Sequence, residues 1–395
     1  MLLLVVALHT RRTRGKRAAA AVAVVVGVAC LALPASSMAA GQVKVMTRNL
    51  YLGADLTPGV KAKNLQELVN AAGTIIHQVD KNKFPVRAKG LAAEILKKKP
   101  DLVGLQEVAL WRTGPCTENP VPPKATKVRY DYLKRLLATL NKSGKNYRLV
   151  ISKPEFDFEI QANTDGNDST SAPGCPLGSE INVRLTMRDA IIARVGHVTT
   201  SNAKAGTFDT LLQEKPAGFS VNVTRGWTQV DGKVPGAGKF RFVNTHLEAF
   251  DNQTKNHTNK NTDVGRGRVR EAQAKELIKK NGPATGKLPV ILLGDLNSDK
   301  ATEVKPGDGL AYKALLKAGF VERSATKPLS CCIKASLLTT SGGGKLSDFN
   351  HKVDHVMTNK PKLVTLASSA VTGRKPVNGF WDSDHAGLFS SLTLP

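Results

Sequence analysis

The segment Leu288-Pro-Val-Ile-Leu-Leu-Gly-Asp-Leu-Asn-Ser298 joins a short apolar run to two polar residues, Asp295 and Asn297. An uninterrupted apolar run of this length predicts a buried strand. Because Asp295 and Asn297 are two residues apart, their side chains point to the same face if the chain stays extended. One can then bind or activate water while the other donates to a phosphate, although Asp-x-Asn also forms Asx turns at strand ends.

The same pattern of a strand followed by a polar residue recurs along the chain. It places the following candidates at strand ends: Asn49, Glu107, His246, Asp354 with His355, and Ser383-Asp384-His385. A carboxylate such as Glu107 is a ligand that Mg²⁺ prefers, although a strand-end Glu can also be merely solvated. A carboxylate that orients an imidazole fixes its tautomer, which makes Asp354 and His385 a candidate pair. A lone histidine such as His246 is more often structural.

Helices and strands alternate in both halves of the sequence. Apolar residues at helical spacing predict helices at 65–79, 86–99, 131–140, 269–280 and 311–318. Strands are expected at 43–48, 102–105, 147–152, 181–187, 190–195, 239–245, 288–293, 352–357, 363–370 and 388–394. Polar, Gly- and Pro-rich stretches at 113–127, 153–178, 203–218, 231–238 and 339–345 indicate surface loops. This order suits sheets packed together with helices outside.

Taken in order from Val43 to Leu392, these motifs resemble the endonuclease/exonuclease/phosphatase superfamily. That superfamily includes pancreatic-type deoxyribonucleases, abasic-site endonucleases and neutral sphingomyelinases. The resemblance implies an α/β fold, a four-layer α/β/β/α sandwich of two packed mixed sheets with outer helices. It places the site at the shared edge of the sheets.

The resemblance also implies a divalent-metal site and a water nucleophile. Glu107 would bind Mg²⁺, with Mn²⁺ as a possible substitute, assisted by Asn49 and Asp384. Asp295 would position or deprotonate the attacking water, and Asn297 would hold that water or the phosphate. Direct in-line attack by water, without a covalent enzyme intermediate, is then expected.

The remaining roles concern the phosphate and the leaving oxygen. By the same resemblance, Asp354 would orient His385, whose imidazole contacts the scissile phosphate. His246 would stabilise the charged transition state or protonate the leaving oxygen. Arg188 stands where deoxyribonuclease-like members carry a phosphate-contacting arginine, and Asp189 where other members have Asn. The alternative for this pair is a solvated strand end.

The first forty residues have the pattern of a secretory signal peptide. Five basic residues precede an uncharged run, Ala18–Leu33, and small residues follow up to Ala40. We therefore expect cleavage near residue 40, a secreted protein and one catalytic domain over residues 41–395. A retained membrane anchor is the alternative, although the run is short for a span. Without these five residues the formal net charge falls from +25 to +20.

Four cysteines follow this segment, namely Cys116, Cys175, Cys331 and Cys332. In an exported protein an even count suggests two disulfides. We expect Cys116 to pair with Cys175, which leaves Cys331 and Cys332 as a vicinal pair. A metal site that includes the vicinal pair is the alternative.

The substrate stays open at this level. The strongly basic balance favours polyanions, which makes nucleic acid the expected substrate and an anionic phospholipid surface the alternative. A nuclease, a sphingomyelinase or phospholipase C-like phosphodiesterase, and a phosphomonoesterase are the enzyme candidates. A catalytically silent binding protein would have lost Glu107, Asp295 or His385, and none is lost. No protein partner is implied, and we expect a monomer.

Overall fold

The computed structural model describes residues 41–117, 121–251, 266–299, 307–340 and 342–394. The expected signal peptide, residues 1–40, lies outside this described part. Among the described residues, no helix is long and apolar enough to cross a membrane.

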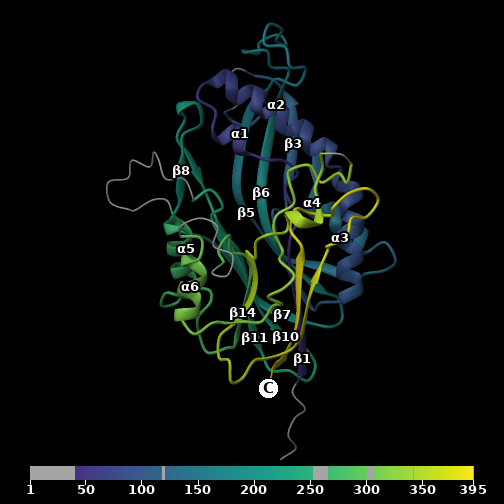
Figure 1. Ribbon diagram of the computed structural model, residues 1–395, viewed down its shortest axis with the longest axis vertical. Helices are drawn as coiled ribbons and strands as arrows, with labels where there is room; N and C mark the ends of the chain where they lie inside the picture. Colours follow the sequence, from purple (N-terminus) through teal and green to yellow (C-terminus); the bar gives the residue numbers. More distant parts are fainter. Residues whose placement is uncertain (1–40, 118–120, 252–265, 300–306, 341, 395) are drawn as a thin grey trace, which may run out of the picture. The chain divides into compact units, whose positions relative to one another are not determined.

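Two mixed β-sheets form the centre of the domain (Figure 1). The larger sheet has eight strands. In spatial order they are β15 (Thr365–Thr372), β16 (Gly387–Leu394), β1 (Gly41–Asn49), β2 (Leu102–Gln106), β6 (Ile181–Arg194), β3 (Leu110–Pro115) and β4 (Lys127–Asp131), with β5 (Tyr147–Ala162) also paired to β6.

The smaller sheet has six strands. In spatial order they are β13 (Val321–Glu322), β14 (Asp354–Thr358), β12 (Val290–Asp295), β11 (Phe240–His246), β10 (Gly226–Lys233) and β7 (Thr199–Thr207). A separate hairpin consists of β8 (Leu212–Glu214) and β9 (Val221–Val223).

Helices cover the outer face of each sheet (Figure 1). The α-helices are α1 (Thr57–Val60), α2 (Leu65–Lys81), α3 (Phe84–Lys98), α4 (Tyr132–Leu140), α5 (Arg268–Ile278) and α6 (Leu310–Lys317). Two short 3₁₀ helices are η1 (Pro216–Gly218) and η2 (Leu346–Asp348).

Three apolar cores separate the layers. Residues of α2, α3 and α4 pack on the larger sheet, for example Leu91 and Leu136 against Val103. Val45 and Phe242 belong to the core between the two sheets. Residues of α5 and α6 pack on the smaller sheet. This order confirms the predicted four-layer α/β/β/α sandwich.

The predicted elements recur with some differences. The expected strands 181–187 and 190–195 are one continuous strand, β6, which runs through Arg188 and Asp189. Part of the expected loop 153–178 is strand, because β5 continues to Ala162. There Phe156, Phe158 and Ile160 alternate with polar residues, and a register shift after Pro154 accommodates the proline.

Edge and polar strands account for other differences. β7 falls partly in the expected loop 203–218. It lies at the edge of its sheet and is largely exposed, so it has no buried apolar face to reveal it in the sequence. β10 is buried but contains polar residues such as Gln229 and Asp231.

Both expected cysteine pairs are bonded. Cys116 is joined to Cys175, and Cys331 to its neighbour Cys332. The pairing predicted from the sequence is confirmed.

Candidate active site

The candidate site lies where strand ends from both sheets meet. Asn49 is the last residue of β1, and Glu107 directly follows the parallel strand β2. In the other sheet, His246 at the end of β11 is level with Asp295 of β12. Asp295 is in turn level with Asp354 at the start of β14. The two sheets thus bring together side chains that are far apart in the sequence.

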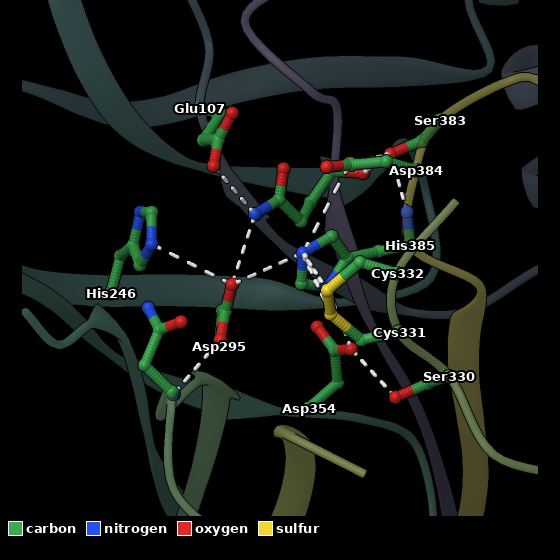
Figure 2. The surroundings of a disulfide bond; sticks show 12 residues. Glu107, His246, Asp295, Ser330, Cys331, Cys332, Asp354, Ser383, Asp384 and His385 are labelled. Carbon is green, nitrogen blue, oxygen red and sulfur yellow. Dashed lines mark hydrogen bonds and ion pairs between the residues drawn. A yellow bond between two sulfur atoms is a disulfide. The ribbon is translucent and has the colours of Figure 1, made fainter. Parts of the chain in front are cut away.

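Asp295 is the carboxylate on which the other groups converge (Figure 2). Its Oδ2 accepts a 3.0 Å hydrogen bond from Asn49 Nδ2. The same oxygen lies 3.6 Å from Nε2 of His246 and of His385. Its Oδ1 accepts a 2.9 Å hydrogen bond from the backbone N–H of Asn297. Burial raises the pKa of Asp295 to about 6, against the pull of His385, so this carboxylate can accept a proton near neutral pH.

Glu107 is tied to Asp295 through Asn49. Its Oε1 accepts a 3.1 Å hydrogen bond from Asn49 Nδ2, and its Oε2 accepts a 2.7 Å hydrogen bond from the backbone N–H of Leu52. Glu107 has a φ of +53°, in the left-handed region that non-glycine residues seldom adopt. Such a conformation persists only where its surroundings hold it, as they do here.

His385 is held by Asp354. The Nδ1 atom of His385 lies 2.9 Å from Asp354 Oδ2, which also accepts a 2.7 Å hydrogen bond from the hydroxyl of Ser330. Burial disfavours a charged imidazole, but Asp354 and Asp295 outweigh it and raise the pKa of His385 well above its usual value. This shift favours the imidazolium form of His385, whose Nε2 faces Asp295.

His246 is held in the opposite protonation state. A guanidinium can only donate, so the 3.1 Å contact of Arg225 with Nδ1 of His246 makes that nitrogen the acceptor. Burial and the charge of Arg225 lower the pKa of His246 well below its usual value. His246 is thus a neutral imidazole with its hydrogen on Nε2, which faces Asp295.

Asp384 completes a crowded set of carboxylates. Its Oδ1 lies 4.0 Å from Nε2 of His385. Burial raises its pKa to about 7; His385 opposes that rise, while Glu107 and Asp295 add to it. Carboxylates this close repel one another, and a divalent cation relieves that repulsion. Glu107, Asn49 and Asp384 carry the kind of oxygen atoms that a hard cation such as Mg²⁺ prefers.

Asn297 contacts the site through its backbone N–H, which donates to Asp295 Oδ1. Its side-chain Nδ2 donates to the carbonyl of Leu247 at 3.0 Å, and its φ is +46°. This contact fixes the turn after β12 that carries Asp295.

Arg188 is the predicted site residue that the structure engages elsewhere. Its guanidinium donates to the carbonyl of Val108 at 2.9 Å and to Asp131 Oδ1 at 2.6 Å. Successive residues of a strand point to opposite faces, so Arg188 lies on the face of β6 opposite to Asp189. The expected contact of Arg188 with phosphate stays a prediction.

Three buried titratable residues, Arg225, Glu155 and Asp189, interact with one another near His246, and two of them, Arg225 and Glu155, were not predicted from the sequence. Arg225 also forms an ion pair with Glu248 at 3.4 Å. Within the described ranges, the carboxylate oxygens of Asp189 and Glu155 have no hydrogen-bond partner. Burial raises the pKa of Glu155 to about 8 and that of Asp189 well above its usual value. Arg225 precedes β10, which was not expected, so no local signal marked it.

Comparison with known proteins shows the family to which the chain belongs. The model of the Endonuclease/Exonuclease/phosphatase family matches residues 64–385, which is most of the chain. This chain belongs to the endonuclease/exonuclease/phosphatase family. Members of the family are hydrolases that act on phosphate esters and typically use divalent metal ions. No curated protein sequence matched the chain.

Solved structures of family members are similar in fold but remote in sequence. A family protein from Bacteroides thetaiotaomicron is 16% identical, covers 90% of this chain and 99% of its own, and superposes with a TM-score of 0.50. A mannosyl-6-phosphatase of the same species is 15% identical, covers 89% of this chain and 100% of its own, and has a TM-score of 0.46. TDP2 of D. rerio, complexed with a single-strand DNA product, is 17% identical, covers 89% of this chain and 99% of its own, and has a TM-score of 0.44. At these identities the likeness concerns the fold alone.

Proposed function

We propose that this family member is a secreted, divalent-metal-dependent phosphodiesterase that hydrolyses polynucleotides by in-line attack of water. The observation that carries the proposal is the convergence on Asp295 Oδ2 of Asn49 and two histidines whose pKa values are shifted in opposite directions, that of His246 down and that of His385 up. Such a centre can provide a proton acceptor, a cationic donor and a neutral donor around one carboxylate.

Each residue has a proposed part in the reaction. Asp295 positions the water and takes its proton, because its pKa of about 6 leaves it ionised but basic at neutral pH. The Nε2–H of His385 holds a phosphate oxygen, and Asp354 keeps that imidazolium in place. The Nε2–H of His246 stabilises charge that develops at the phosphate or on the leaving oxygen.

Glu107, Asn49 and Asp384 would hold the divalent cation. When bound, such an ion polarises a phosphoryl oxygen and neutralises developing charge. Asn49 also keeps Glu107 at a fixed distance from Asp295 through its two hydrogen bonds of 3.1 and 3.0 Å.

The charge of the chain supports polynucleotides as the substrate. Residues 41–395 carry a formal net charge of +20, the +25 of the whole sequence less the five basic residues before Ala18. Lys and Arg that neutralise phosphates release counterions, which gives affinity for any polyanionic strand. The disulfides Cys116–Cys175 and Cys331–Cys332 support the proposed export, since such bonds persist in oxidising compartments.

A cavity favours a second candidate, a phospholipase C-like activity on sphingomyelin or another phospholipid. This cavity of about 140 Å³ is lined mostly by apolar side chains of α1, α2, β3, β5 and β6, among them Trp111, Phe156 and Met187. Arg225, which contacts His246, also lines it. An apolar part of a substrate could occupy this cavity while its phosphate reaches the site. A phosphomonoesterase would have no use for the cavity.

A substrate panel separates these candidates. Purified protein with Mg²⁺ would be assayed on plasmid DNA, RNA, sphingomyelin vesicles and a phosphomonoester across a salt series. We expect nicking of nucleic acid that weakens steeply with salt. Vesicle hydrolysis without any cleavage of DNA or RNA would overturn the nuclease proposal and support the second candidate. The substitution Gly59→Phe, at a residue that lines the cavity, should impair vesicle hydrolysis only.

A further inference from the structure

The bonded pair Cys331–Cys332 lies against the imidazole of His385 (Figure 2). The Sγ atoms are 3.6 Å and 3.9 Å from Nε2 of His385. That nitrogen is also the one that faces Asp295. The Cys331 side chain is buried, whereas Cys332 is exposed, so a solute can reach the pair from the side of Cys332.

Backbone hydrogen bonds fix the pair in this position. Cys331 exchanges two of them with His351, at 3.0 and 2.8 Å. On the other side, Ile333 N–H donates to Asp384 O at 2.8 Å, and Ala386 N–H donates to Ser330 O at 2.7 Å. The cysteine segment is therefore attached to both residues that flank His385 in the sequence. Breaking the sulfur–sulfur bond would leave both sulfurs beside the imidazole.

We propose that the reduced pair and His385 form a binding site for a thiophilic divalent cation, with Zn²⁺ as the type, that switches hydrolysis off. The three ligand atoms already lie within 4.8 Å of one another. Zinc–sulfur and zinc–nitrogen bonds of about 2.3 and 2.05 Å at a tetrahedral angle separate S from N by about 3.6 Å. The observed separation of Cys331 Sγ, 3.6 Å, equals that value, and that of Cys332 Sγ, 3.9 Å, is slightly longer.

The chemistry has two steps. A reductant first cleaves the disulfide: a dithiol is oxidised to its own disulfide, or a phosphine and water become phosphine oxide, and two thiols form. Zn²⁺ then binds both sulfurs and Nε2 of His385, and the two thiol protons, together with any proton on Nε2, are released to solvent. The oxidised pair offers no thiolate and cannot do this.

The sulfur site is chemically distinct from the oxygen site. Glu107, Asn49 and Asp384 suit a hard cation, whereas two thiolates and an imidazole select a soft one. Zinc on Nε2 removes the hydrogen that His385 would offer to phosphate. The inhibition rests on the proposed function of His385; the binding itself does not.

Zinc binding to purified, ion-free protein tests the proposal. One sample would keep its disulfides, and a second would be reduced with a phosphine, because a dithiol would itself bind zinc. Both samples would then be titrated with Zn²⁺ by calorimetry. Cd²⁺ would be titrated in parallel for its thiolate charge-transfer absorption in the ultraviolet. We expect one tight equivalent, with the cadmium absorption, in the reduced protein only.

Two double variants serve as matched controls. In Cys331→Ser/Cys332→Ser the affinity should fall at least about a hundredfold, because even residues that only support a metal ligand contribute about 10- to 100-fold. In Cys116→Ser/Cys175→Ser, which lacks the other disulfide, affinity after reduction should be unchanged. Equal zinc affinity in the oxidised and reduced protein, or in the Cys331/Cys332 variant and the parent, would overturn the proposal.

Phosphodiesterase assays then test whether zinc binding at this site inhibits hydrolysis. The Cys331/Cys332 variant should keep the parent's Mg²⁺-dependent activity and lose its zinc inhibition after reduction. Tight zinc binding without any inhibition would overturn the switch. If no substrate is cleaved, the proposed function fails while the binding result stands.

Discussion

His246 and His385 both direct Nε2 toward Asp295 Oδ2, but different neighbours set the charge of each imidazole. Asp354 and Asp295 stabilise positive charge on His385. Arg225 beside His246 repels positive charge and occupies its Nδ1. Environment alone thus makes one imidazole a cation and the other a neutral donor.

Substitution of His385 tests the cationic donor. His385→Ala should lower kcat on the preferred substrate at least about a hundredfold, since a positioned acid or base contributes on that scale. Asp354→Asn should lower kcat less, because the imidazole remains but loses its partner at 2.9 Å. Circular dichroism and thermal unfolding would show that both variants fold. Near-normal turnover of His385→Ala would make this pair structural only.

Substitution of Arg225 tests the neutral donor. Arg225→Gln removes a positive charge that lowers the pKa of His246, so that pKa should rise. Nuclear magnetic resonance titration of the His246 ring measures it directly. Arg241→Gln is the matched control, because Arg241 forms its ion pair with Asp231 instead. An unchanged His246 titration in Arg225→Gln would refute the assignment.

At the scale of the elements, the end of β12 sets the position of Asp295. Gly294 has a φ of +145°, and a Cβ there would overlap the carbonyl oxygen of Thr245 on the paired strand β11. Gly294→Ala should therefore destabilise the protein by about 3 kcal/mol and lower activity beyond that loss.

Chemical denaturation of the parent and of Gly294→Ala measures the loss in the free energy of unfolding. Gly319→Ala is the control, since its φ is +86° but nothing lies within 4 Å of the added Cβ. Gly319→Ala should cost only the backbone strain, about 1 kcal/mol. Equal losses in both variants would show that the approach of β11 is unimportant.

The sequence predicts those elements whose pattern is local. β12 and β2 are apolar runs and α2 is amphipathic, so the positions of these elements can be predicted from the sequence. So can the polar residues at the ends of the two strands, Asp295 for β12 and Glu107 for β2. β7 and β10 are exposed or polar strands, stabilised by pairing with distant partners. Arg225 was missed for that reason. The contacts of Arg188 could not be predicted either, because the face to which it points depends on the pairing of β6 with β2 and β3.

At the scale of the whole molecule, the crowded carboxylates couple stability to pH. In the ion-free protein the pKa is about 7 for Asp384 and about 6 for Asp295, above the value of about 3.9 for Asp in an unfolded chain. The folded protein then binds more protons than the unfolded chain, so these groups lower the free energy of unfolding as pH rises from about 4 to 7.

Magnesium should reverse this effect, because it competes with protons for the same oxygens. We expect Mg²⁺ to raise the Tm more at pH 8 than at pH 6. Asp384→Asn should reduce the difference, since it removes the group with the higher pKa. Thermal unfolding with and without Mg²⁺ at both pH values measures it. Equal shifts at pH 6 and pH 8 would speak against an ion among these carboxylates.

The central claim is that a divalent cation held by Glu107 acts together with Asp295 and the two histidines in hydrolysis. The most direct measurement is the rate of plasmid DNA cleavage as a function of Mg²⁺ for the parent and Glu107→Gln, starting from excess chelator. The account predicts no cleavage in chelator, full recovery with Mg²⁺ or Mn²⁺, and for Glu107→Gln a higher Mg²⁺ requirement with lower maximal turnover. Full cleavage in excess chelator, or the same Mg²⁺ dependence in both proteins, would contradict it.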